Sequence, residues 1–163
     1  KKMNPPLRTE ADVEAIKKAV TEGVLDVIAT DHAPHHPEEK EAGYEKALNG
    51  VIGLETSFAV SYTELVENGS LSPLDLLRRM SLTPARILGI DRGSLREGAV
   101  ADLAIINVDE EYTIQADDFE SKSRNSAFLG RKVKGKIDLT MVSGRIVWDS
   151  GRLQKIMPKG DMK

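Results

Sequence analysis

The chain has 163 residues and a mass of 17.9 kDa, which is enough for one sizeable core but too short for a complete (β/α)8 barrel of about 250 residues. Its 23 basic and 26 acidic residues give a net charge of −3, which argues against nucleic-acid and polybasic membrane-binding proteins. Cysteine is absent, so disulfides and thiolate metal sites are excluded. No apolar run approaches the roughly 18 residues of a membrane span, and we do not expect the opening residues to be a signal peptide. We therefore expect a soluble, cytoplasmic protein and, since the chain opens with Lys1-Lys2, a piece of a longer one.

The first third of the chain shows an α/β pattern. Thr9 and Asp12 have the spacing of a capping box, and apolar residues recur at helical spacing as far as Gly23. The run 24–30 (VLDVIAT) is apolar and β-branched, which predicts a strand buried on both faces. A polar loop, 31–37, follows that strand. Helix, strand and then a polar loop is the order found in α/β barrels and open sheets.

Helices are predicted in the middle of the chain. Residues 38–50 are charged and are expected to form a loop. Residues 53–67 predict a helix whose buried positions are expected at Leu54, Phe58 and Leu65. Ser72-Pro73 is an N-cap followed by proline at the first helical position, and it opens a helix to about Met80 with Leu74, Leu76 and Leu77 on its apolar face. Thr83-Pro84 is expected to start a further short helix, which Gly89 ends.

The pattern changes near residue 90, where strands replace helices. Residues 100–107 predict one strand, and the alternation over 137–141 predicts another. A Ser143-Gly144 turn joins the latter to 145–148 in a hairpin, with Trp148 expected in the core. We therefore predict two parts: an α/β part, 1–90, and a β-rich part, 91–163.

Potential chemistry is concentrated in residues 31–36, where the three histidines of the chain follow Asp31. A carboxylate at the end of a barrel strand can bind zinc or act as a general base, and imidazoles can bind a metal or an anionic substrate. Pro34 stiffens the loop. A solvated loop without function is the alternative on spacing alone. Zinc needs three or four ligands, so this loop cannot complete a zinc site without partners from elsewhere.

Several segments resemble one enzyme family. Residues 2–8 (KMNPPLR) and 26–35 (DVIATDHAPH) are similar to dihydroorotases of the longer bacterial form, in the amidohydrolase superfamily. Further similarity lies in segments 53–56 (GLET), 83–89 (TPARILG), 98–103 (GAVADL) and 123–128 (SRNSAF) and in the final hairpin. The similarity covers nearly the whole chain but only the last two-fifths or so of such an enzyme.

The resemblance implies a fold and an activity. The fold would be α/β: the C-terminal part of a metal-dependent-hydrolase (β/α)8 TIM barrel, plus part of a small β-sandwich. The activity would be zinc-dependent, reversible hydrolysis of (S)-dihydroorotate to N-carbamoyl-L-aspartate in pyrimidine biosynthesis. We expect residues 1–163 to be inactive alone, because the other zinc ligands would lie outside them.

The resemblance also implies roles for individual residues. Asp31 falls on the catalytic aspartate, which binds Zn2+ and moves a proton. Asn4 and His35 fall on positions that contact the dihydroorotate ring or its carboxylate. Asn49 and Gly50 fall on a loop that contacts substrate through its backbone. The chain departs from the family pattern at Asn49, where an aromatic residue is common, and at Ala127, where proline is common.

Other residues near these are expected to be structural. His32 is expected to form structural hydrogen bonds, His36 to face solvent, and Arg8 to pair with a nearby acid. Two further readings stay open: another cyclic amidohydrolase, such as an allantoinase or a hydantoinase/dihydropyrimidinase-like enzyme, and a non-catalytic dihydroorotase-like subunit of aspartate transcarbamoylase. Neither a nucleic acid nor a membrane is an expected partner, and the parent enzyme is expected to be a homodimer or to associate with aspartate transcarbamoylase.

Overall fold

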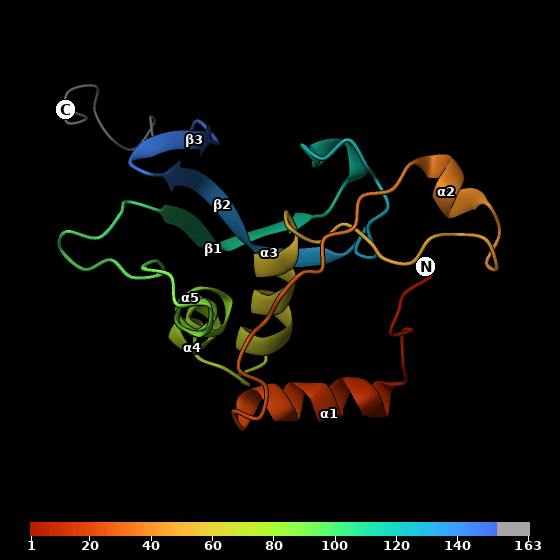
Figure 1. Ribbon diagram of the computed structural model, residues 1–163, viewed down its shortest axis with the longest axis horizontal. Helices are drawn as coiled ribbons and strands as arrows, with labels where there is room; N and C mark the ends of the chain where they lie inside the picture. The colour runs from red at the N-terminus through yellow and green to blue at the C-terminus, as the bar shows by residue number, and fades with distance from the viewer. Residues whose placement is uncertain (153–163) are drawn as a thin grey trace.

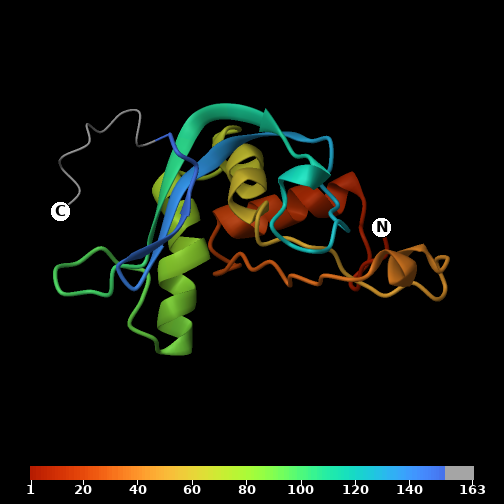
Figure 2. The same cartoon turned by 90° about the horizontal axis from the view of Figure 1, so that it is seen from above.

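A curved antiparallel sheet covers a layer of helices, with one further helix beneath that layer (Figures 1 and 2). The computed structural model describes residues 1–152, and the predicted β-rich part extends beyond them. In chain order the elements are α1 (Glu10–Thr21), α2 (Pro37–Glu41), α3 (Ser57–Ser61), η1 (Tyr62–Val66), α4 (Pro73–Leu77), η2 (Arg78–Leu82), α5 (Thr83–Leu88), β1 (Leu103–Thr113), η3 (Ala116–Asp118), β2 (Lys132–Val142) and β3 (Arg145–Asp149). Within the described residues, no helix is long and apolar enough to cross a membrane.

Helix α1 begins as the sequence predicts. The Thr9 side chain accepts a hydrogen bond from the Asp12 amide, and the Asp12 carboxylate accepts one from the Thr9 amide. This reciprocal pair satisfies donors at the start of the helix that have no intrahelical partner. Val20 is buried in the layer above, whereas Ile16 is 57% exposed. One narrow face of α1 therefore packs inward.

The predicted buried strand 24–30 is wrong for this chain. These residues run without a strand partner, and Val24 is 69% exposed. One lateral backbone hydrogen bond is formed, from the Ile28 amide to the Arg79 carbonyl (3.2 Å). A buried parallel strand needs a ladder on each side, and residues 1–152 offer this segment none. The prediction of a loop over the charged residues 38–50 is wrong at its start, where the short helix α2 forms.

The helix predicted over 53–67 forms only from Ser57, and its second half, η1, is π-helical. Leu65 is buried and Phe58 is half-buried, as expected. Leu54 is 61% exposed, which contradicts the prediction. It lies in the turn before the helix and therefore does not share the helix's buried face.

Ser72 caps α4 as predicted, since its hydroxyl accepts from the Asp75 amide at 3.1 Å. The predicted break before Thr83 is absent, because a π-helical segment, η2, joins α4 to α5 in one continuous helix. Gly89 ends it in the left-handed conformation (φ +66°), as expected. On its first turns only Leu76 is buried; Leu74 and Leu77 are exposed, contrary to the prediction.

The sheet has the order β1-β2-β3 and is antiparallel throughout. The Ser143-Gly144 turn joins β2 to β3, as predicted; both residues have positive φ. Strand β1 begins three residues later than the expected strand and continues to Thr113. Trp148 is 44% exposed instead of buried, because β3 is the edge strand.

The helix made of α3 and η1 lies between two apolar clusters. On the sheet side Ala59 packs in a cluster with Ile52, Ile114, Phe119 and Val133. On the other side Tyr62 and Leu65 pack with Val20 of α1 and Leu76 of α4. The first cluster draws on residues from both sides of residue 90; the division into parts 1–90 and 91–163 stays a prediction.

Candidate functional site

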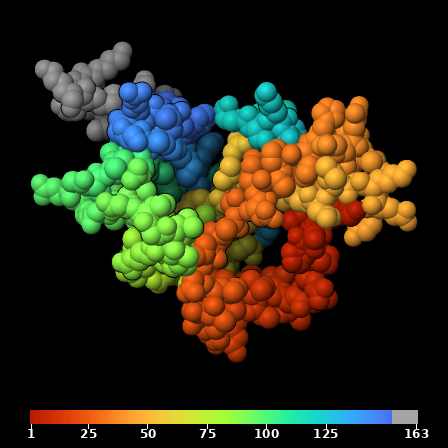
Figure 3. Space-filling model, in the orientation of Figure 1, coloured from red at the N-terminus to blue at the C-terminus, as the bar shows by residue number. Residues whose placement is uncertain are grey.

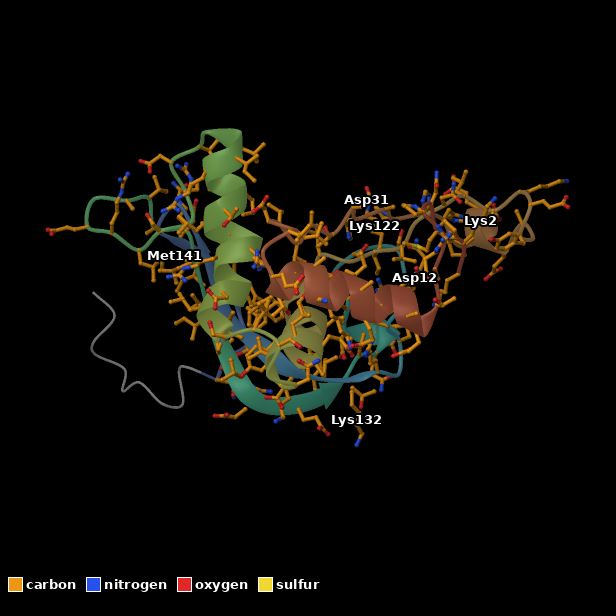
Figure 4. The ribbon with its side chains drawn as sticks, turned by 90° about the horizontal axis from the view of Figure 1, so that it is seen from below. Lys2, Asp12, Asp31, Lys122, Lys132 and Met141 are labelled. Atoms are coloured by element: carbon orange, nitrogen blue, oxygen red, sulfur yellow. The ribbon has the colours of Figure 1, made fainter. Side chains whose placement is uncertain are left out.

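Asp31 lies at the start of the polar loop, directly after the extended segment 24–30. Its backbone is left-handed (φ +44°), a conformation that a short polar side chain tolerates better than most. The residue is exposed, and Figure 4 shows it at the surface, on the side of the molecule away from Lys132. Within residues 1–152, no hydrogen bond or ion pair engages its carboxylate. The carboxylate is therefore available to accept a proton or to bind a cation.

His35 is held in place from several directions. Its ring Nε2 lies 2.8 Å from the carbonyl oxygen of Asn49, and its side chain is only 18% exposed. Its main-chain carbonyl accepts from the Ser123 hydroxyl at 3.0 Å, and its amide donates to Asn125 Oδ1 at 3.4 Å. The ring Nδ1 lies 3.8 Å from a carboxylate oxygen of Glu39. The imidazole is thereby oriented against the loop that contains Asn49.

The loop at Asn49 and Gly50 packs directly on the loop after Asp31. The Ala33 amide donates to the Val51 carbonyl at 3.0 Å, and the Gly50 amide donates to the Lys2 carbonyl at 3.0 Å. Gly50 has φ +102°, and a Cβ there would lie 2.7 Å from the Cβ of Ala33. Glycine is therefore required at this position both by the backbone and by the close approach.

Two residues that the sequence did not single out organise these loops. The Asn125 amide donates to the carbonyls of Ala33 (2.9 Å) and Gly50 (3.4 Å). The Lys40 ammonium, on α2, donates to the carbonyls of Leu48 (2.6 Å) and Gly50 (2.8 Å). Asn125 comes from a loop 90 residues after His35, so only tertiary structure shows its role. In the sequence, Lys40 is one of several charged residues in its segment, and nothing there indicates that it binds a loop.

The flanking residues have the structural roles expected of them. The His32 Nδ1 accepts from the amides of Gly53 (3.1 Å) and Leu54 (3.3 Å), just before α3. His36 has a side chain that is 66% exposed and caps α2 by accepting from the Glu38 amide. The Nε atom of Arg8 lies 3.8 Å from a carboxylate oxygen of Asp12.

The structure thus brings three of the five predicted site residues into direct contact: His35, Asn49 and Gly50. Asp31 precedes His35 by four residues on the same loop. Asn4 is exposed and precedes a cis peptide bond to Pro5. Within residues 1–152, its side chain forms no hydrogen bond with the other four. Residues 35–50 of this region, orange to yellow-orange in Figure 3, form one end of the molecular surface.

Beside these loops is a hollow of about 340 Å³ whose lining includes Lys2, Lys40, Tyr44 and Asn125. Among the described residues, no group of three His, Cys, Asp or Glu side chains is arranged to hold a metal ion. Asp31 could supply one ligand. The arrangement therefore offers one free carboxylate, a fixed imidazole and a tightly held backbone loop.

Sequence comparisons identify relatives along nearly the whole chain. It is 53% identical over 149 residues to a dihydroorotase of Citrifermentans bemidjiense, a match that covers 91% of this chain and 35% of that protein. It is 44% identical over 153 residues to a dihydroorotase of Elusimicrobium minutum, covering 94% of this chain and 35% of that protein. The chain thus spans about a third of the length of these curated relatives.

Solved structures share the fold. An L-hydantoinase (dihydropyrimidinase) from Arthrobacter aurescens superimposes with a TM-score of 0.85 at 35% identity, over 91% of this chain and 34% of that one. A dihydropyrimidinase from Brevibacillus agri gives a TM-score of 0.87 over 91% of this chain and 33% of that one, and at 23% identity it supports the fold alone. The sequence profile of the amidohydrolase family matches residues 4–147. The chain belongs to the amidohydrolase family.

Proposed function

We propose that this chain is the C-terminal part of a dihydroorotase, which hydrolyses the cyclic amide of (S)-dihydroorotate reversibly to N-carbamoyl-L-aspartate. The observation that carries the proposal is the exposed, unpaired carboxylate of Asp31, four residues before the fixed imidazole of His35. Relatives 44% and 53% identical that carry the name dihydroorotase support this choice of substrate.

In the proposed reaction, Asp31 acts as the general base and then as the general acid. Water adds to the ring carbonyl carbon, and its proton passes to the Asp31 carboxylate. The carbon–nitrogen bond then breaks, and the proton passes from Asp31 to the departing amide nitrogen. Asn4, His35 and the loop that contains Asn49 and Gly50 bind the ring and its carboxylate.

This chain would supply one ligand to a zinc ion, at a site shared with residues outside it. The Asp31 carboxylate has no partner among residues 1–152 and would contribute one oxygen ligand, whereas a catalytic zinc site needs about three protein ligands. The other ligands would come from residues outside this chain. When bound, such a metal polarises the substrate carbonyl and makes water more acidic.

The proposed fold is the last portion of a (β/α)8 barrel over residues 1–90 and part of a composite β-sandwich over 91–163. The extended segment 24–30 supports this, because it has the composition of a buried strand but no lateral ladder. Exposed apolar side chains on the helices, such as Ile16 and Ile87, are consistent with faces that the remaining two-thirds of the protein would cover.

A hydantoinase or dihydropyrimidinase is the second candidate, favoured by the fold match to the A. aurescens L-hydantoinase at 35% identity. A chimera separates the two. Residues 1–163 would replace the matched third of the C. bemidjiense dihydroorotase, and the product would be assayed on dihydroorotate, hydantoin and dihydrouracil. The proposal predicts hydrolysis of dihydroorotate at a rate near that of the unaltered relative. Preference for hydantoin or dihydrouracil would favour the second candidate, and the 163-residue chain alone is expected to show no turnover.

A further inference from the structure

Lys40 holds two carbonyls of one short loop. Its ammonium donates to the oxygens of Leu48 (2.6 Å) and Gly50 (2.8 Å), and the carbonyl between them, that of Asn49, faces the His35 ring at 2.8 Å. Three successive carbonyls are therefore held by side chains from the 35–40 segment. In an extended segment alternate carbonyls, here those of Leu48 and Gly50, face the same side, so one ammonium can bind both.

Helix α2 fixes the position of Lys40. The helix begins with a capping box between His36 and Glu39, in which the His36 amide donates to the Glu39 carboxylate at 2.8 Å. The Glu39 carbonyl accepts from the Leu48 amide at 3.1 Å, so the helix is also tied to the loop through its backbone. A long, flexible lysine is thereby anchored close to the carbonyls that it binds.

The two peptide groups that Lys40 holds each have an unused donor. A trans peptide group directs its N–H away from its C=O. The N–H partners of the Leu48 and Gly50 carbonyls belong to Asn49 and Val51, and within residues 1–152 neither has an acceptor. By contrast, the amide of Gly50, in the intervening peptide, donates to the Lys2 carbonyl.

We propose that Lys40 is a positioning residue: by holding the Leu48 and Gly50 carbonyls, it directs the Asn49 and Val51 amides away from itself and toward a carboxylate of the substrate. The inference rests on the proposed function for the identity of that carboxylate. It assigns Lys40 no contact with substrate, and it explains why a loop with Asn49 in place of the family's common aromatic residue can still bind through its main chain. Hydrogen bonds from a charged donor are stronger than those between neutral groups, so the two that Lys40 donates can fix the conformation of this loop.

The test uses the chimera described above with three variants. Lys40→Met removes the ammonium, Lys40→Arg retains donors that can reach two carbonyls, and Lys46→Met is the matched control on a nearby lysine for which the structure gives no side-chain partner. We expect Lys40→Met to raise KM for dihydroorotate about tenfold or more while kcat changes less than about threefold. Lys40→Arg should restore most of the affinity, and Lys46→Met should leave KM unchanged.

Equal KM values for Lys40→Met and Lys46→Met would overturn the proposal, as would a fall in kcat at constant KM. A second measurement is independent of activity. In the 15N-labelled 163-residue chain, Lys40→Met should shift the amide resonances of Asn49 and Val51, whereas Lys46→Met should not. An inactive chimera with native Lys40 would count against the proposed function; unshifted Asn49 and Val51 resonances would count against the role of Lys40.

Discussion

The side-chain amide of Asn125 donates a 2.9 Å hydrogen bond to the main-chain carbonyl of Ala33, across 92 residues of sequence. The same side chain accepts from the His35 amide, and the Asn125 carbonyl accepts from the Ile52 amide at 3.3 Å. One residue from the β-rich half therefore joins both loops of the candidate site. The parallel bridge between Ile52 and Ser126 lies immediately beside it.

Replacing Asn125 tests how far the site depends on this connection. Asn125→Ala leaves the half-buried carbonyl of Ala33 without its donor, so we expect a loss of about 1–3 kcal/mol in the free energy of unfolding, measured by urea denaturation. Lys122→Ala, in the same loop and exposed, is the control and should change it by less than about 0.5 kcal/mol. Equal effects of the two substitutions would show that Asn125 does not tie the loops together.

The cost of a side chain at position 50 has a conformational part and a steric part, which two substitutions separate. Gly50→Ala combines a positive φ with a Cβ placed 2.7 Å from the Ala33 Cβ, whereas Gly43→Ala has a similar φ (+83°) and open space around it. We expect Gly50→Ala to destabilise the fold by at least about 1 kcal/mol more than Gly43→Ala, in the same denaturation assay. A smaller difference would mean that the two loops can separate at little cost.

Leu76 is the fully buried anchor of the helical layer, with 0% of its surface exposed, while Leu74 on the same helix is 56% exposed. Leu76→Ala should cost about 2–5 kcal/mol, because it removes methyl groups and leaves a cavity among Val20, Tyr62 and Leu65. Leu74→Ala should cost less than about 1 kcal/mol in this chain. Comparable losses for both variants would contradict the packing described for α4.

The cap of α4 gives a pH-dependent contribution. The Ser72 hydroxyl, followed by the Arg78 guanidinium, holds the pKa of the Asp75 carboxyl below its ordinary value of 3.8. Because the folded-state pKa is lowered, the contribution is present above pH 3.8 and is lost as the pH falls through the lowered value. Ser72→Ala should therefore lower the free energy of unfolding at pH 7. The difference in this free energy between the variant and the native chain should become smaller as the pH falls toward 2. A difference that stays constant from pH 7 to pH 2 would contradict this account.

Local chemistry made some elements predictable from the sequence. The Thr9–Asp12 capping box, the Ser72 cap, the Gly89 stop and the Ser143-Gly144 hairpin depend on residues within four positions of each other, and all four form. The expectation that His32 forms structural hydrogen bonds is also confirmed. The two caps, the glycine stop and the hairpin turn need no tertiary context, whereas the partners of His32 lie 21 and 22 residues further along the chain.

The errors arose where burial depends on neighbours far away in the sequence. The segment 24–30 has the composition of a buried strand, but composition does not supply the adjacent strands that make one. Trp148 is apolar yet lies on an edge strand with 44% of its surface exposed. Lys40 gave no signal, since a lysine in a charged run is an ordinary surface residue. Asn125 lies in the segment 123–128 that resembles the family, but nothing in that segment indicates that its side chain binds loops some 75 to 92 residues away.

The central claim, that Asp31 carries proton transfer in a cyclic amidohydrolase, is tested most directly by one pair of substitutions in the chimera. Asp31→Asn keeps the shape of the side chain and removes its basicity, and Asp26→Asn makes the same change on an exposed carboxylate of the preceding segment 24–30. We predict that Asp31→Asn lowers kcat for dihydroorotate by about 10²–10⁴-fold while Asp26→Asn leaves it nearly unchanged. Retention of full kcat by a folded Asp31→Asn chimera would contradict the claim.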